Sequence, residues 1–122
     1  MHLAGVRRQL TEARDALVES AGHAGRGEYD PAYRRALRSR NLLFHAARGL
    51  AAARREELPE MPVTGAPGGA IDDHHGGVAA IDAALAVADD LEMGPHLDAA
   101  RPPYARYLGW LRDEVGRIMR GA

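Results

Sequence analysis

Apolar residues recur three or four positions apart along most of this chain, and this spacing predicts helices. Over residues 3–21 the recurring residues are Leu3, Val6, Leu10, Ala13 and Leu17. Such a spacing places all of these side chains on one face of a helix. Gly22 is expected to end the helix, because glycine readily adopts the left-handed conformation that closes a helix C-terminus.

A second, longer helix is expected from Pro31 to Leu58. Asp30 comes directly before Pro31, which indicates a helix start because a carboxylate can cap free N–H groups and proline is tolerated in the first turn. The core-facing side is expected to follow a seven-residue repeat with three flanking apolar residues: Leu37, Phe44, Ala51 and Leu58, beside Ala36, Leu43 and Leu50. Pro59 stops this helix, whose length is then about 42 Å.

Residues 59–73 hold three prolines and three glycines, so a long irregular connection is predicted there. The third helix is expected to begin with Asp72 or Asp73 as its cap and to continue to Leu91. Gly94 and the proline after it are the expected stop signal.

The fourth helix is expected to begin at Pro102 or Pro103 and to reach Met119. Four amphipathic helices predict an all-α fold, a four-helix bundle in up-down-up-down order that forms one domain over residues 1–122. The 122 residues are 46% hydrophobic and only 5% aromatic, a composition that suits one core of closely packed helices.

The charged residues divide into two opposed segments. From Arg34 to Arg55 there are seven arginines and no acid, whereas residues 56–98 hold ten acids and no arginine. If the second and third helices are neighbours, these charges pair; otherwise part of the basic side stays free for a polyanion. The side turned away from Leu37 and Phe44 carries the candidate binding residues Arg34, Arg38, Asn41, His45, Arg48 and Arg55.

The segment from Arg40 to His45, with the sequence RNLLFH, resembles the R-N-x-x-x-H signature of the HEPN superfamily. Many of these small helical domains are metal-independent ribonucleases. The resemblance implies RNA as a partner, a homodimer, His45 as the acid/base group, Arg40 as the phosphate stabiliser and Asn41 as an orienting residue. RNA supplies its own 2′-hydroxyl nucleophile, so a group with a pKa near neutrality beside a fixed cation suffices for cleavage.

Three other functions are weighed against this hypothesis. The stretch from His45 to Gly49 resembles the H-x-x-K-G core of histidine phosphotransfer domains, with Arg48 in place of lysine. A non-catalytic protein-interaction or dimerisation module is the second alternative. The third is a small-molecule-binding biosynthetic enzyme with a pocket between helices, in which Tyr104 and Tyr107 would supply polar contacts.

Several classes of site find no support in the sequence. The chain has no cysteine, so a disulfide framework and thiolate metal sites are excluded. Asp72 and His75 have a spacing that a metal could use, but capping by an aspartate is the favoured role, and no metal or cofactor is expected. No apolar run approaches the length of a membrane span, and a cytoplasmic location is expected.

Overall fold

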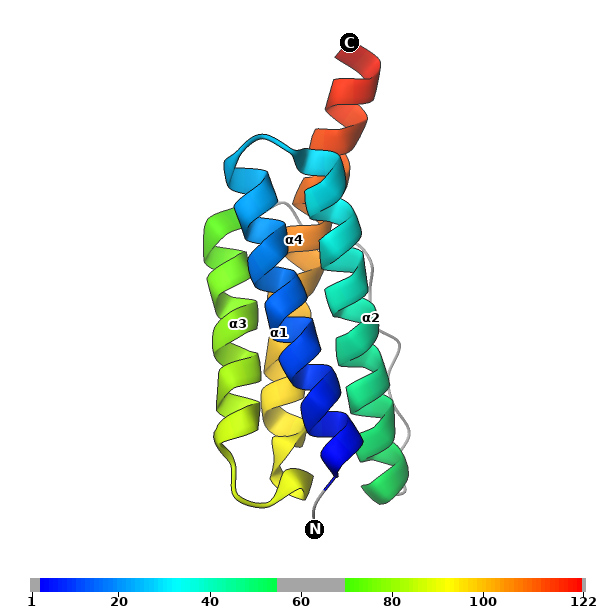
Figure 1. Ribbon diagram of the computed structural model, residues 1–122, viewed down its shortest axis with the longest axis vertical. Coiled ribbons are helices and arrows are strands. Elements are labelled where there is room, and N and C mark those ends of the chain that lie inside the picture. The colour runs from blue at the N-terminus through cyan, green and yellow to red at the C-terminus, as the bar shows by residue number, and fades with distance from the viewer. Residues whose placement is uncertain (1–2, 55–69, 122) are drawn as a thin grey trace.

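The computed structural model describes residues 3–54 and 70–121 of the chain. These residues form helix α1 (Ala4–Gly25), helix α2 (Tyr29–Arg54), helix α3 (Ala70–Ala86), a short 3₁₀ helix η1 (Asp90–Met93) and helix α4 (Gly94–Gly121). The long helices pack into the bundle shown in Figure 1. The predicted all-α, four-helix fold is therefore confirmed.

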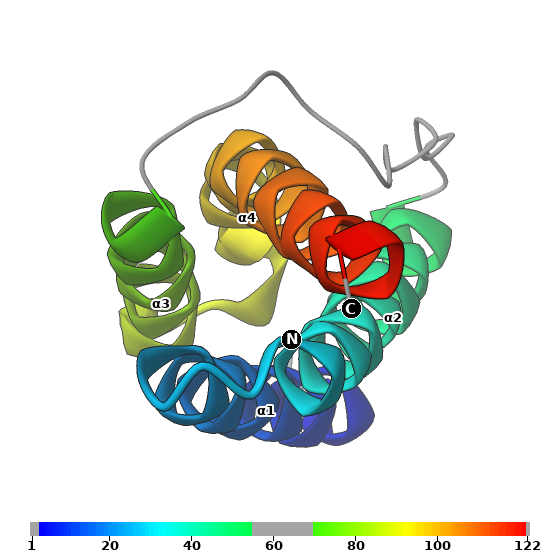
Figure 2. The ribbon, with the colours of Figure 1, turned by 90° about the horizontal axis from the view of Figure 1, so that it is seen from above.

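Viewed from above, the helices follow the cyclic order α1, α2, α4 and α3, so that α2 and α3 occupy opposite corners (Figure 2). Within the described residues α2 makes no contact with α3, although each packs against both other long helices. Of the two alternatives left open by the sequence, the one in which the basic and acidic helices are neighbours is therefore ruled out for the described residues. The acids of α3 pair elsewhere: Asp82 with Arg14 of α1, and Asp73 with Arg106 of α4.

The helices run up, down, down and up, because α3 points in the same direction as α2 (Figure 1). Arg7 near the start of α1 donates to the carbonyl oxygen of Leu85 near the end of α3 at 3.0 Å, whereas Arg14 bonds to Asp82 one turn earlier in α3. The direction of α3 therefore differs from the up-down-up-down order predicted from the sequence. Residues 55–69 separate the two helices, and fifteen extended residues can reach about 50 Å, enough to join opposite ends of the bundle.

The hairpin of α1 and α2 is held together by a seam of small and leucine side chains. Six of the buried residues of α2 recur at alternating steps of four and three, with Ala47 buried beside them: Ala32, Ala36, Ser39, Leu43, Ala46 and Leu50. Leu37, Phe44 and Ala51, which were expected to face the core, are only half-buried at its edge. The small side chains allow α1 to approach closely, so the buried seam lies one position away from the largest apolar residues.

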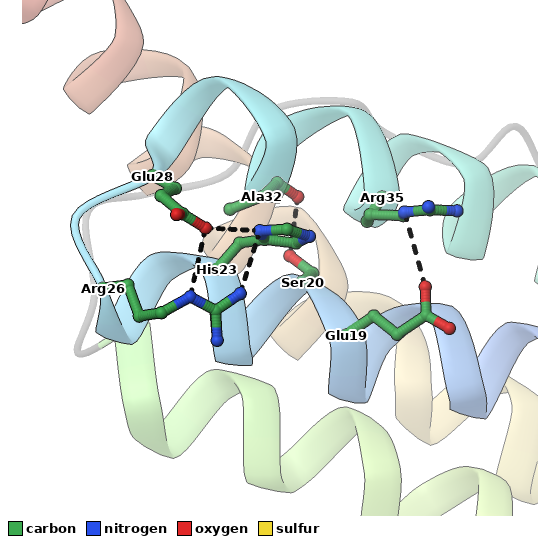
Figure 3. A network of polar contacts seen from close by, with 7 residues as sticks. All are labelled: Glu19, Ser20, His23, Arg26, Glu28, Ala32 and Arg35. Carbon is green, nitrogen blue, oxygen red and sulfur yellow. Dashed lines mark hydrogen bonds and ion pairs between the residues drawn. The ribbon is translucent and has the colours of Figure 1, made fainter.

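The turn between α1 and α2 comes later than predicted, because α1 continues through Gly22 to Gly25. Gly27 supplies the left-handed conformation, with φ of 74°. Figure 3 shows the polar contacts at this turn: His23 Nδ1 lies 2.7 Å from Glu28 Oε1, and Arg26 Nε donates to the same oxygen at 3.1 Å. These two groups lower the pKa of the Glu28 carboxyl.

The remaining helix boundaries also differ from the predictions. Helix α3 begins at Ala70 and ends at Ala86, so residues 70–73 are helical and Leu91 lies in η1. Asp73 does not cap α3, since it lies in the first turn of the helix and its carboxylate accepts a hydrogen bond from Arg106 of α4. The rest of the predicted connection, residues 59–69, and the predicted end of α2 at Leu58 lie outside the described residues.

Helix α4 begins at Gly94, and Pro102 and Pro103 lie inside it. A proline in a helix removes the hydrogen bond to the carbonyl four residues earlier. The carbonyl groups freed here are those of Asp98 and Ala99. Both residues are exposed, so water can solvate these carbonyls. Burial continues across the prolines at Met93, Leu97, Ala100, Tyr104, Leu108 and Leu111. This packing stabilises a helix that continues through the two prolines at which the sequence predicted its start.

Candidate nucleic-acid interface on helix α2

The outward side of α2 carries a polar, basic surface, which we call the α2 basic face: Arg34, Arg38, Asn41, His45 and Arg48. All five side chains are exposed. They recur three or four positions apart, which places them in one row along the helix. Arg55, the sixth predicted member of the row, lies outside the described residues.

The cations of this row differ in how far their charge is already neutralised. Arg34 forms an ion pair with Asp30 one turn earlier, and the adjacent Arg35 lies 3.4 Å from Glu19 of α1. Within the described part of the chain, Arg38 and Arg48 have no carboxylate partner. Among the described residues of the α2 basic face, Arg38 and Arg48 are therefore the cations whose charge no carboxylate neutralises.

The three residues of the R-N-x-x-x-H motif are not joined by one hydrogen-bond network in the described structure. Arg40 is half-buried, and its Nη1 donates to Asn41 Oδ1 at 3.0 Å. His45 lies one turn beyond Asn41 on the exposed side, and it forms no hydrogen bond with either residue in the described structure. The structure thus joins Arg40 and Asn41 by a hydrogen bond, and no hydrogen bond joins His45 to either of them in the described residues.

His45 lies instead beside an aromatic ring and a second cation. The rings of Phe44 and His45 meet edge to face with their centroids 6.1 Å apart. The guanidinium carbon of Arg48 lies 5.9 Å from the centroid of the Phe44 ring, within the range of a cation–π contact. Phe44, predicted as a core residue, thus also contributes to the exposed surface.

Gly49, beside this group, has a packing role. A Cβ atom at this position would lie 3.0 Å from Val6 Cγ2 of α1, a distance too short for most Cβ contacts. The glycine therefore permits the close approach of α1 and α2. In the phosphotransfer interpretation the same glycine leaves room beside His45 for a partner domain, and this geometry does not favour that role.

The tyrosines expected to line a small-molecule pocket are buried and engaged. Ser39 donates to the carbonyl oxygen of Ala13, so the hydroxyl of Tyr104, 2.6 Å away, donates to Ser39. Ser20 and Tyr107 form a second such pair at 2.8 Å. Burial raises the pKa of both tyrosines. Their hydroxyl groups therefore fix α4 against the α1–α2 hairpin and are not available to a ligand.

A second polar cluster lies where α3 meets α4, and sequence reasoning missed it. Asp73 is buried and accepts from Arg106 Nε at 2.8 Å, while its other oxygen, Oδ2, is buried without a hydrogen-bond partner. The ring of His74 packs 6.0 Å from that of Tyr107, and its Nε2 is also buried without a partner. No local signal could have linked Asp73 to a residue 33 positions away.

Metal binding finds no support in the described structure. Among residues 3–54 and 70–121, no group of three or more His, Cys, Asp or Glu side chains is placed to hold a metal ion. His74 and His75 lie side by side, with ring centroids 4.9 Å apart. Burial, and then the charge of His75, lower the pKa of His74.

No described helix is long and apolar enough to cross a membrane. Comparison of the chain with protein-family models, with curated proteins and with solved structures finds no match. The case for a function therefore rests on the residues of this chain alone.

Proposed function

We propose that this chain binds RNA along the α2 basic face and cleaves it with His45 as the acid/base group. The observation that carries the proposal is the exposure of Arg38, His45 and Arg48 on a helix side that the acidic helix α3 does not cover. Arginine side chains in a row match the spaced charges of a phosphate backbone. The neutral-range pKa of histidine suits proton transfer at physiological pH.

The cleavage chemistry uses the 2′-hydroxyl group of the RNA. His45 removes the proton of this hydroxyl, and the 2′-oxygen then attacks the adjacent phosphorus. The bond between this phosphorus and the 5′-oxygen of the next nucleotide breaks. The departing 5′-oxygen takes a proton from a second imidazolium. An arginine guanidinium stabilises the negative charge that develops on the phosphate oxygens.

Two copies of the chain are part of this proposal. In one chain no hydrogen bond joins His45 to Arg40 or Asn41, and a second imidazole is needed to protonate the leaving group. A homodimer that pairs two α2 basic faces around one RNA strand would supply His45 from each protomer. It would also bring the Arg40–Asn41 pair of one protomer near the His45 of its partner.

Incubation of labelled single-stranded RNA with the protein in EDTA tests the cleavage step. We expect metal-independent cleavage that is lost in His45→Ala. His75→Ala is the matched control, since it removes another exposed histidine on α3 and should leave cleavage unchanged. Cleavage that survives His45→Ala, or that disappears equally in the control, contradicts the assignment of His45.

A second candidate is a non-catalytic dimerisation module, favoured by the end of α4. This end projects beyond the turn between α1 and α2 (Figure 1), and Ile118 and Met119 on it are 46% and 78% exposed. They continue the buried row of Leu108 and Leu111, so a second copy of the chain is the occupant of this surface. If so, Ile118→Arg with Met119→Arg converts a dimer to a monomer in light scattering, and RNA is not cleaved.

A further inference from the structure

Three planar groups lie together at Phe44: its own ring, the ring of His45 and the guanidinium of Arg48. Phosphate binding requires only positive charge and does not account for the two rings. The Phe44 ring is half-buried against the core, with the Arg48 guanidinium 5.9 Å from its centroid and the edge of the His45 ring beside it. Both Arg48 and His45 are exposed. Because Arg48 is exposed, its planar guanidinium is accessible to solvent as well as to the Phe44 ring.

Planar groups of this kind recognise nucleic-acid bases. An unpaired base stacks on aromatic rings and on guanidinium planes, and this contact is tolerant of sequence because every base has a π-face. Arginine suits the role because its guanidinium is planar, whereas the ammonium group of lysine is a compact point charge.

We propose that Arg48, supported by Phe44, forms a stacking platform for one unpaired base, so that the α2 basic face takes single-stranded RNA in preference to duplex RNA. This inference rests on the proposed function, because Arg38 and His45 contact the phosphates and the ribose of the same strand. The platform determines which form of RNA is bound, and it is separate from the acid/base chemistry.

The exclusion of duplex RNA follows from the geometry of the platform. In a duplex the faces of each base are covered by its neighbours, and the major groove of A-form RNA is too deep and narrow for side chains to read. Arg48 lies on the outer wall of a straight helix, only about 4.5 Å along the axis from His45. A base that stacks on Arg48 while its phosphate lies at His45 must have one of its faces free, as the unpaired bases of a single strand do.

Two conservative substitutions distinguish the contribution of stacking to RNA binding from the contributions of charge and of core packing. Arg48→Lys keeps the positive charge on an exposed residue and removes the planar group. Phe44→Leu keeps an apolar side chain against the core and removes the ring. Arg112→Lys is the matched control, because Arg112 is exposed on α4 and lies outside the α2 basic face.

Fluorescence anisotropy with a labelled oligoadenylate, a duplex of the same length and inorganic polyphosphate tests the inference on the full chain. We expect tighter binding of the oligoadenylate than of the duplex. Arg48→Lys and Phe44→Leu should weaken oligoadenylate binding by about tenfold, a typical loss for one stacking contact. Binding of the duplex and of polyphosphate should stay unchanged in both variants, and Arg112→Lys should bind all three probes as the wild type does.

The outcomes distinguish this inference from the proposed function. Equal binding of single strands and duplex, unaffected by Arg48→Lys and Phe44→Leu, overturns the stacking platform and leaves RNA binding in place. Losses that are the same for oligoadenylate and polyphosphate also overturn it, because they show an effect of charge. If the wild type binds polyphosphate and neither RNA, the proposed function itself fails.

Discussion

The hydroxyl groups of Ser39 on α2 and Tyr104 on α4 lie 2.6 Å apart in the core. Ser39 also donates to the carbonyl oxygen of Ala13 on α1, so this one side chain joins three helices. Ser20 and Tyr107 form a similar pair nearer the turn between α1 and α2, where Ser20 donates to the carbonyl oxygen of Ala32. Both pairs fix the rotation of α2 about its axis, and thereby the side of α2 that stays exposed.

Tyr104→Phe is predicted to lower the free energy of unfolding by about 1 kcal/mol, because a buried hydrogen bond to Ser39 is lost while the ring stays in place. Urea denaturation measures the change. Tyr33→Phe is the matched control, since Tyr33 is half-buried and its hydroxyl forms no hydrogen bond with any of the described residues. An equal loss in the two variants would show that the contact with Ser39 adds nothing to stability.

The neighbouring glycines of α3 are predicted to respond in opposite directions to alanine. A Cβ at Gly77 would lie 2.9 Å from Leu17 Cδ2 and 3.2 Å from the Tyr104 ring, which Ser39 holds in place. Gly77→Ala should therefore destabilise the protein by about 1–3 kcal/mol. A Cβ at Gly76 would meet Pro103 at an ordinary 3.4 Å, so Gly76→Ala should stabilise α3 by up to about 1 kcal/mol. Thermal unfolding of both variants checks the signs, and equal shifts would contradict the packing described.

Acidification is predicted to destabilise the contact of α3 with α4 through His74. Burial lowers the pKa of this imidazole in the folded protein, so the unfolded chain binds the proton more readily. Stability is then full above the ordinary histidine pKa of about 6.5 and falls as the pH drops below it.

Unfolding of the wild type and of His74→Gln across that pH range measures this contribution. The variant should lose less stability on acidification than the wild type. His45→Gln serves as the control, because His45 is exposed on α2 and lies outside the contact between α3 and α4. The same slope in the wild type and in His74→Gln would contradict the assignment.

The helical fold and the exposed row on α2 were predictable from the sequence because both follow from local periodicity. The 3.6-residue repeat of the helix placed Arg38, His45 and Arg48 on one side, and the structure shows all three exposed. The identity of the buried seam was predicted less well. The largest side chains, such as Phe44, were expected at its centre, but Ala36 and Ser39 lie there, because closely packed helices favour small residues.

Contacts between distant segments could not be predicted from local patterns. Arg7 binds the buried Asp90 and the carbonyl oxygens of Leu85 and Val87, and nothing in the sequence near Arg7 indicates this. Helix α4 passes through Pro102 for the same kind of reason. The burial of Leu97 and Ala100 outweighs the lost hydrogen bonds, and that burial depends on helices far away along the chain.

The salt dependence of RNA binding tests most directly whether the α2 basic face is the binding surface. The variant Arg38→Gln with Arg48→Gln is compared with Arg112→Gln and Arg120→Gln, which removes the same charge from exposed positions on α4. We predict that the first variant binds single-stranded RNA more weakly and that its slope of log K against log salt is smaller by about 2. The second variant should match the wild type. Equal losses of affinity and slope in both variants would contradict a site on α2.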